Sequence, residues 1–570
     1  MIRAQLLHGL RRKRRLQIAG VVPFAGLALI VAGAAPAREA PVVAGVTTHF
    51  AQGWPERLLP VARALGAGMI RDAVAWPAVE KTPGAFAFTP ANSAHVDRAC
   101  AAGLKVLLMV EPRNPLYDAG QTAHSPTALA AYARYARALA DRWPHCVAAL
   151  EIGNEINGKG GMTGPAAANR IASHIALLRA VHDAVKPAHP DLALLGGSTN
   201  GVPVGFLRQL FGPGALGLVD GVAVHPYRRH PEGVEQDMGR LSAAMRAAGT
   251  VRPIWATEFS RDFARPEDAA PFYLKMIALM EGAGVRHHLW YALADQRGFP
   301  TMGLARFDGS EKPAGRAFRF AAARLRPLGP ARRIDHGDPA LYDYGFGETV
   351  RVIWGAPRGF TAVAAGPDSV RALAADGSPI PVPSAVSDTP VVLVGVRDLR
   401  LAYPRVLADS LYGFSQPPLA WFARRIGTPA GPRLLPLVMR DWQWDGYLGA
   451  AGLSGAAVTP MGTAVAPGTA TLIRWRAPAP ATVYASACLA ARAPEGGNLR
   501  AAIEHNGTPR WAGPTGGSST AALARVAVAA GDTLDLVIAN PGNPTAQVRY
   551  RWRIATTPAD PAPCPLEPTP

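Results

Sequence analysis

The chain has 570 residues, of which 49% are hydrophobic and 18% are charged. This composition can bury a large core and excludes wholesale disorder, and the length excludes a single small binding module. The formal net charge is +18, but no basic stripe interleaved with aromatic residues occurs, so nucleic-acid binding is not expected. An acidic polysaccharide would suit an exported basic protein, although a solvated basic surface is the simpler explanation of the charge.

Residues 1–37 have the features of a signal peptide. A basic cluster lies at Arg11–Arg15, an apolar run follows from Ile18 to Ala35, and Ala35-Pro36-Ala37 has the small-x-small form of a signal-peptidase site. We therefore expect an exported protein that is periplasmic, membrane-anchored or extracellular. An uncleaved membrane anchor is the alternative, because about eighteen apolar residues are at the lower limit for crossing a bilayer.

Residues 42–328 alternate between short apolar runs and helix-length segments. Apolar side chains recur at steps of three and four over Leu129–Trp143 and Ile171–Val185, as in amphipathic helices. Strands and helices alternating in this way match an α/β fold, the (β/α)8 TIM barrel. An open doubly wound sheet is the alternative, but Gly45–His49 after the first run lacks a GxGxxG phosphate loop. The apolar runs are residues 42–46, 68–70, 106–110, 147–152, 192–196, 219–224, 253–256 and 287–290.

After residue 328 the helical periodicity gives way to short strands separated by turns. The pattern predicts a small all-β domain over residues 329–405, then a Pro-rich connection over 406–440. Residues 441–557 are predicted to form a C-terminal β-sandwich, and residues 558–570 a tail. The sandwich could bind carbohydrate through aromatic residues, although core packing is the simpler explanation. These residues are Trp442, Trp444, Tyr447 and Trp511.

Four cysteines can pair in an exported chain. Cys100 and Cys146 precede two consecutive apolar runs, and Cys488 and Cys564 both lie in the C-terminal quarter. Each pair could form a disulfide, and four free thiols are the alternative. No CxxC or Cys/His cluster has the spacing of a zinc site, so neither a metal nor another cofactor is expected.

Two glutamates end strands on opposite sides of the expected barrel. Glu155 follows the fourth run, and Glu258 follows the seventh. Reactive groups of a TIM barrel lie at the C-terminal ends of its strands, so the two side chains should meet at the barrel mouth. Two carboxyl groups beside one sugar ring can hydrolyse a glycosidic bond, directly at about 5 to 5.5 Å or through water at about 6.5 to 9.5 Å. Solvated strand-end acids are the alternative.

Gly153-Asn154-Glu155 on the fourth strand and Glu258 on the seventh resemble the retaining glycoside hydrolases of clan A. Residues 42–328 are similar to glycoside hydrolase family 39, including its exopolysaccharide-cleaving members, and to the family 5 cellulases. The resemblance implies that Glu155 is the acid/base and Glu258 the nucleophile. It also implies that Asn154 binds the sugar 2-hydroxyl.

Further strand ends fit the same resemblance. In His225-Pro226-Tyr227 after the sixth run, Tyr227 would hydrogen-bond Glu258, and Arg71 at the second strand would lower the pKa of Glu258. A core tyrosine, a capping histidine and a surface ion pair are the simpler alternatives.

Aromatic and polar residues at the remaining strand ends are candidates for sugar binding. Trp290 and Tyr291 at the eighth strand would form an aromatic platform, with core packing as the alternative. His49 and Glu111 would point to the barrel mouth, and Asn114 would line a subsite.

The sequence therefore favours an exported retaining glycoside hydrolase that acts on a polysaccharide or oligosaccharide. Endo-action on a secreted bacterial polysaccharide is our hypothesis. The scheme requires a raised pKa at Glu155 and a low one at Glu258. An exo-acting, β-xylosidase-like glycosidase is one alternative, and a non-catalytic polysaccharide-binding or assembly protein on the same scaffold is another.

Overall fold

The structure, a computed structural model, describes most of the chain after residue 40. The predicted signal peptide and residues 559–570 of the predicted tail lie outside the described residues. Within them, no helix is long and apolar enough to cross a membrane. The described residues are 41–338, 340–403, 406–412, 422–426, 433–436, 438–441, 446–449, 458–459, 462–491, 499–515, 517–542 and 544–558.

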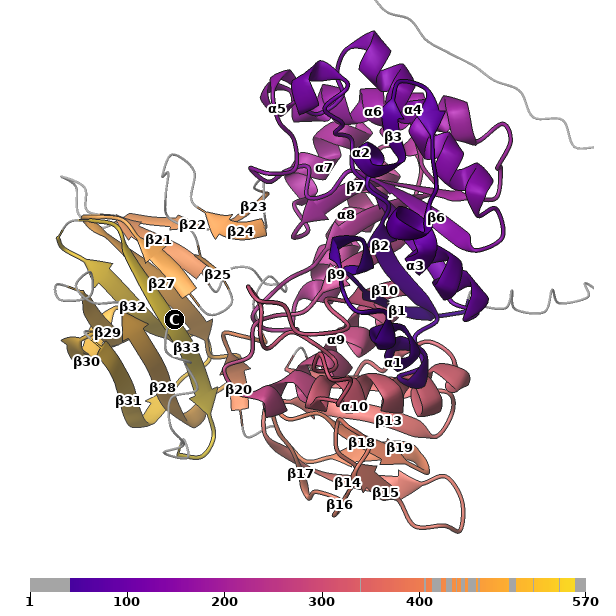
Figure 1. The fold of residues 1–570 in the computed structure, drawn as a ribbon. Helices are drawn as coiled ribbons and strands as arrows, with labels where there is room; N and C mark the ends of the chain where they lie inside the picture. The colour runs from indigo at the N-terminus through magenta and orange to yellow at the C-terminus, as the bar shows by residue number, and fades with distance from the viewer. Residues whose placement is uncertain are drawn as a thin grey trace, which may run out of the picture. The chain divides into compact units, whose positions relative to one another are not determined.

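Eight parallel strands close into a barrel in the order β1-β10-β9-β8-β7-β6-β5-β2 (Figure 1). The predicted TIM barrel is confirmed, and each predicted apolar run overlaps one barrel strand. The strands are β1 (Val43–Thr47), β2 (Met69–Ala73), β5 (Lys105–Val110), β6 (Val147–Ile152), β7 (Ala193–Asn200), β8 (Gly221–His225), β9 (Ile254–Phe259) and β10 (His287–Trp290).

Helices follow the barrel strands along the chain. The two predicted amphipathic helices are α4 and α6, and α4 begins where the Ser125 side chain accepts a hydrogen bond from the Ala128 amide. The helices are α1 (Leu59–Ala64), α2 (Trp76–Val79), α3 (Pro90–Ala101), α4 (Pro126–Arg142), α5 (Pro165–Ala168), α6 (Arg170–Val185), α7 (Val204–Phe211), α8 (Val234–Ala247), α9 (Ala269–Gly282) and α10 (Pro313–Phe320).

The barrel interior has an apolar floor beneath a polar layer. Since side chains alternate between the two faces of a strand, the residue two positions after a floor residue also points inward. Glu151 follows Ala149 in this way, and Arg71 follows Met69. A polar layer at the carboxyl ends of the strands is the result. The floor consists of Met69, Leu107, Ala149, Leu195, Ala223, Trp255 and Leu289.

The predicted disulfide between Cys100 and Cys146 is confirmed, with Cα atoms 5.5 Å apart. It connects the end of α3 to the segment before β6. Cys488 is also disulfide-bonded, and its predicted partner Cys564 lies outside the described residues.

The chain after the barrel forms antiparallel sheets, as predicted. A six-stranded and a three-stranded sheet pack around one apolar core that includes Ile353 and Phe360. The predicted strands Val350–Trp354 and Val391–Val394 coincide with β13 and β18. These sheets contain β11 (Arg332–Arg333), β12 (Leu341–Phe346), β13 (Val350–Gly355), β14 (Arg358–Ala364), β15 (Arg371–Leu373), β16 (Pro379–Ile380), β17 (Ala385–Val386), β18 (Val391–Val394) and β19 (Val396–Leu401).

The last part of the chain forms two further antiparallel sheets that share a second core, which includes Ile473 and Tyr550. The strands are β20 (Val406–Asp409), β21 (Phe422–Ile426), β22 (Arg433–Pro436), β23 (Val438–Asp441), β24 (Gly446–Gly449), β25 (Val458–Thr459), β26 (Gly462–Val465), β27 (Thr469–Arg476), β28 (Ala481–Ala491), β29 (Arg500–His505), β30 (Thr508–Pro514), β31 (Gly517–Val528), β32 (Thr533–Asn540) and β33 (Ala546–Ala555).

One prediction for this part needs correction. The Pro-rich connection predicted over residues 406–440 contains strands that belong to the C-terminal sheets, because β20 pairs with β33 and β21 with β27. Pro436 is the last residue of β22, which lies at the edge of its sheet, where a proline is tolerated. Trp511 is half-buried against the sandwich core, as core packing predicts. Trp442, Trp444 and the side chain of Tyr447 lie outside the described residues.

Candidate active site

A cleft of about 1390 Å³ opens at the carboxyl ends of the barrel strands. Carboxyl groups, cationic side chains and aromatic side chains from different strands form its wall. The predicted site residues that line it are His49, Arg71, Glu111, Asn154, Glu155, Tyr227, Glu258 and Tyr291.

Glu155 stands in the turn that follows β6. Its φ of 45° lies in the left-handed region, which costs a residue other than glycine about 1 to 3 kcal/mol and is found most often at functional sites. Gly161 packs against this turn so closely that a Cβ there would lie 2.0 Å from the Glu155 carbonyl oxygen. The Glu155 side chain is 31% exposed, and its Oε1 accepts a hydrogen bond of 2.8 Å from Asn200 Nδ2.

Glu258 stands near the end of β9, where the register against β10 shifts. Adjacent residues of a regular strand point to opposite faces. This irregularity lets the side chains of both Thr257 and Glu258 point into the barrel interior. The Tyr227 hydroxyl donates to Glu258 Oε2 at 2.6 Å, and Arg71 Nη1 donates to Oε1. With a side-chain exposure of 9%, Glu258 is the more enclosed of the two glutamates.

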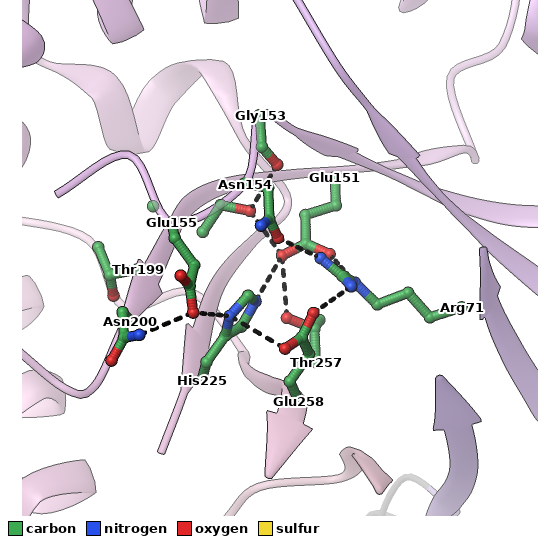
Figure 2. Close-up of polar contacts among 12 residues, drawn as sticks. Arg71, Glu151, Gly153, Asn154, Glu155, Thr199, Asn200, His225, Thr257 and Glu258 are labelled. Carbon is green, nitrogen blue, oxygen red and sulfur yellow. Dashed lines mark hydrogen bonds and ion pairs between the residues drawn. The ribbon is translucent and has the colours of Figure 1, made fainter. Parts of the chain in front are cut away.

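The two carboxyl groups lie on either side of the His225 ring (Figure 2). An oxygen of Glu155, an oxygen of Glu258 and a ring nitrogen of His225 all lie within 4.8 Å of one another. This gap fits direct attack by one carboxylate better than the wider gap that admits a water molecule. The same spacing could admit a metal ion, but Arg71 and Tyr227 already satisfy the two oxygens of Glu258.

Arg71 connects these groups to a buried carboxylate that the sequence analysis did not single out. Its Nε donates to Glu151 Oε2 at 2.6 Å, its Nη1 donates to Glu258, and its Nη2 donates to Asn154 Oδ1 at 2.8 Å. Glu151 is completely buried, and burial raises its pKa, but the charges of Arg71 and His225 outweigh burial and hold that pKa well below its ordinary value. Glu151 is therefore ionised.

The pKa of Glu155 is lower than ordinary, so the predicted raised value is wrong. Burial raises this pKa, but the hydrogen bond and positive charge of His225, with smaller contributions from Asn200 and Arg71, lower it more. Burial lowers the pKa of His225, whereas Glu258 and hydrogen bonds to Glu151 and Glu155 raise it to about 9. The imidazole is consequently charged at neutral pH.

Three predicted sugar-binding residues are buried and do not line the cleft. Trp290 is fully buried and donates from Nε1 to the Met302 carbonyl oxygen, so it belongs to the core. Asn114 donates to the carbonyl oxygen of Glu80 and accepts from the Leu116 amide, so it holds the loop after β5 in place. His225 is buried and contacts the carboxylates of Glu151 and Glu155 from beneath the cleft surface.

Aromatic side chains form one wall of the cleft. The Tyr291 ring lies edge-on to His49 at 5.5 Å and to Tyr227 at 5.9 Å. Phe299 lies 6.2 Å from Tyr291 and is 44% exposed at the rim of the cleft. This wall could stack against the apolar face of a sugar.

The sequence analysis missed Glu151, Ser198, Asn200 and Thr257. Glu151 lies on a buried strand between apolar neighbours, and a charged residue in such a position is a usable signal. Ser198 and Asn200 were missed because β7 extends to Asn200, beyond the predicted end of its apolar run.

Comparisons with solved structures show what the fold resembles. A family 39 glycoside hydrolase from the gut symbiont Bacteroides cellulosilyticus WH2 matches with a TM-score of 0.52 and 19% identity, over 62% of this chain and 81% of that chain. A GH39 β-xylosidase from Caulobacter crescentus matches with a TM-score of 0.45 and 15% identity, over 65% and 96%. A GH5_18 from Streptomyces cattleya in complex with GlcNAc matches with a TM-score of 0.41 and 20% identity, over 52% and 82%.

Of these three matches, the first has a TM-score above 0.5 and supports a similarity of fold. It confirms the predicted resemblance to family 39 for the fold, and at this identity it extends to the fold alone. No family model and no curated protein matches the sequence.

Proposed function

We propose that this chain is a retaining glycoside hydrolase that cleaves a polysaccharide. The observation that carries the proposal is the pair Glu155 and Glu258, whose nearest oxygens lie within 4.8 Å in an open cleft. Glu155 is the more exposed of the two, as suits a group that exchanges protons with a leaving group and with water.

In the proposed reaction Glu258 attacks the anomeric carbon while a proton passes through Glu155 to the departing oxygen, which leaves a glycosyl ester on Glu258. Water then gives a proton to Glu155 and attacks the same carbon, which releases Glu258 as a carboxylate. Tyr227 and Arg71 hold Glu258 in place through their hydrogen bonds. Asn154, fixed by Arg71, offers its amide NH₂ to a sugar hydroxyl.

The size of the cleft supports a substrate of several sugars. Its volume of about 1390 Å³ exceeds the roughly 300 to 1,000 Å³ typical of sites for small ligands. We therefore propose endo-action on a secreted bacterial polysaccharide. Exo-action is the competing outcome, and it would release monosaccharides from the first turnover.

We further propose that the protein acts after export. The disulfide between Cys100 and Cys146 supports this, because disulfides persist in oxidising compartments. The basic and apolar residues of the predicted signal peptide support it from the sequence.

The test is hydrolysis of a panel of bacterial polysaccharides and aryl glycosides by the wild type, Glu155→Gln and Glu258→Gln. We expect turnover by the wild type and a loss of at least about 1,000-fold in Glu258→Gln. Glu267→Gln, a change at an exposed glutamate beyond β9, is the matched control and should leave turnover unchanged. Polysaccharide binding without hydrolysis by the wild type would support the non-catalytic alternative instead.

A further inference from the structure

Glu151 is surrounded by hydrogen-bond donors in the polar layer above the barrel floor. Besides Arg71, the hydroxyl of Ser198 donates to Glu151 Oε1 at 2.5 Å and that of Thr257 donates at 2.9 Å. His225 Nε2 lies 3.4 Å from the same oxygen. Glu151 has no exposed surface, so it cannot touch a substrate.

The donors around Glu151 determine which nitrogen of His225 carries hydrogen. An ionised carboxylate can only accept hydrogen bonds, so the His225 nitrogen that faces Glu151 must be an N–H donor. Nε2 therefore carries hydrogen, and the remaining nitrogen, Nδ1, faces Glu155 and Glu258 (Figure 2). Figure 2 shows the contacts of His225 running to Glu151, Glu155 and Glu258.

The groups around His225 Nδ1 show where one further proton must lie. Nδ1 lies 3.4 Å from Glu155 Oε1 and 3.6 Å from Glu258 Oε2. If Nδ1 carried a lone pair and both carboxylates were ionised, three acceptors would face one another without a hydrogen. One proton must therefore lie between Nδ1 and a carboxylate. Of the two carboxylates only Glu155 lies within hydrogen-bond distance of Nδ1, so Glu155 is the partner that takes it.

We propose that Glu151 is a positioning residue that keeps hydrogen on His225 Nε2, so that His225 Nδ1 and Glu155 share the single proton that the departing sugar oxygen receives. This inference rests on the proposed glycoside hydrolase function. In the free protein the proton is on Nδ1. As the glycosidic bond breaks, the N–H bond of Nδ1 breaks, the proton passes through Glu155 Oε1 to the departing oxygen, and the imidazole becomes neutral. When Glu155 takes a proton from water in the second step, that proton returns to Nδ1.

This arrangement explains how Glu155 can act as the acid although its own pKa is low. The groups that face His225 are the carboxylates of Glu151, Glu155 and Glu258 and the guanidinium of Arg71. Three carboxylates outweigh one guanidinium, and they keep the imidazole charged. The proton for catalysis is therefore held next to Glu155 rather than on it.

Glu151→Gln is the test, because the amide keeps the size of the side chain and removes its charge. The amide NH₂ can donate to Nε2, which leaves hydrogen on Nδ1 alone. Passing that hydrogen to Glu155 would then turn the imidazole into an imidazolate anion, so His225 could no longer supply the proton. Glu281→Gln is the matched control. Glu281 is also a buried glutamate that accepts from a buried histidine, with Oε1 3.0 Å from His288 Nε2, and it does not line the cleft.

The first measurement needs no substrate. In protein labelled with ¹⁵N-histidine, the His225 signals are those absent from His225→Gln. We expect Nε2 of the wild type to keep its hydrogen from pH 5 to pH 8, and Glu151→Gln to lose it within that range. Identical His225 signals in the wild type and Glu151→Gln would overturn the inference, whether or not the protein proves to be a hydrolase.

The second measurement uses 4-nitrophenyl and 2,4-dinitrophenyl glycosides of the sugar, and in the anomeric configuration, that the wild type hydrolyses. General acid catalysis contributes about 100- to 10,000-fold, so we expect Glu151→Gln to lose at least about 100-fold in kcat on the 4-nitrophenyl glycoside, with KM within about threefold. The loss should be at least tenfold smaller on the dinitrophenyl glycoside, whose leaving group departs without a proton. Equal losses on both glycosides would reduce Glu151 to a structural role, and Glu281→Gln should change neither rate. A wild type that hydrolyses no glycoside would contradict the proposed function and leave the first measurement to decide on Glu151.

Discussion

His225 should make the stability of the barrel depend on pH above neutrality. Its pKa is about 9 in the folded protein and about 6.5 in an unfolded chain. Because folding raises this pKa, the stability that His225 contributes is fully present below pH 6.5 and is lost as the pH rises through 9. The two pKa values differ by about 2.5, and one pKa unit is worth about 1.4 kcal/mol, so the contribution is about 3.5 kcal/mol.

The assay is unfolding by urea, followed by circular dichroism at 222 nm, for the wild type and His225→Gln between pH 5 and pH 9.5. The described helices α1 to α10 all lie between residues 59 and 320, so the helical signal reports on the barrel. We expect the difference in unfolding free energy between the two proteins to be constant up to about pH 6.5. It should then fall by about 1.4 kcal/mol per pH unit to about pH 9. A difference that does not change with pH would show that His225 is not charged by its surroundings, and the reasoning on the polar layer would fail.

Three further predictions concern the groups that support the site. Arg71→Met should lower the free energy of unfolding by about 3 to 5 kcal/mol, because it leaves buried carboxylates without their cation; a loss below about 1 kcal/mol in urea unfolding would contradict this. Gly161→Ala should displace the turn that carries Glu155 and lower kcat at least about tenfold, and unchanged kinetics would show that the turn tolerates a Cβ. Replacing both Cys100 and Cys146 by serine should lower the free energy of unfolding by about 3 to 4 kcal/mol and leave kcat unchanged, as measured by urea unfolding and steady-state rates.

The alternation of apolar runs and helix-length segments predicted the barrel and predicted that the two glutamates share one cleft. Both results depend only on strand spacing and on the rule that strand ends meet at one face of a TIM barrel. Trp290 is a residue whose position strand spacing alone did not predict. Leu289 belongs to the barrel floor and Tyr291 lines the cleft, so the residue between them must point outward into the helical layer. The closed barrel decides which face of the strand is inside, and the composition of β10 alone does not.

The polar layer was harder to predict because its parts come from many strands. Glu151 could have been found as a charged residue between apolar neighbours on a buried strand. Its effect on His225, however, depends on a ring nitrogen 3.4 Å away, on a residue 74 positions later in the chain. Thr257 contacts Glu151, and the adjacent Glu258 contacts Arg71. Both contacts depend on a shift in strand register, which strand periodicity does not predict.

The anomeric configuration of the first product tests the roles of Glu155 and Glu258 most directly. Proton NMR during the first minutes of hydrolysis, before mutarotation, distinguishes the configuration of the released sugar from that of the substrate. Two carboxyl groups with oxygens within 4.8 Å should act by double displacement, so we expect the product to keep the configuration of the substrate. A product of inverted configuration would show that water, and not Glu258, attacks the sugar.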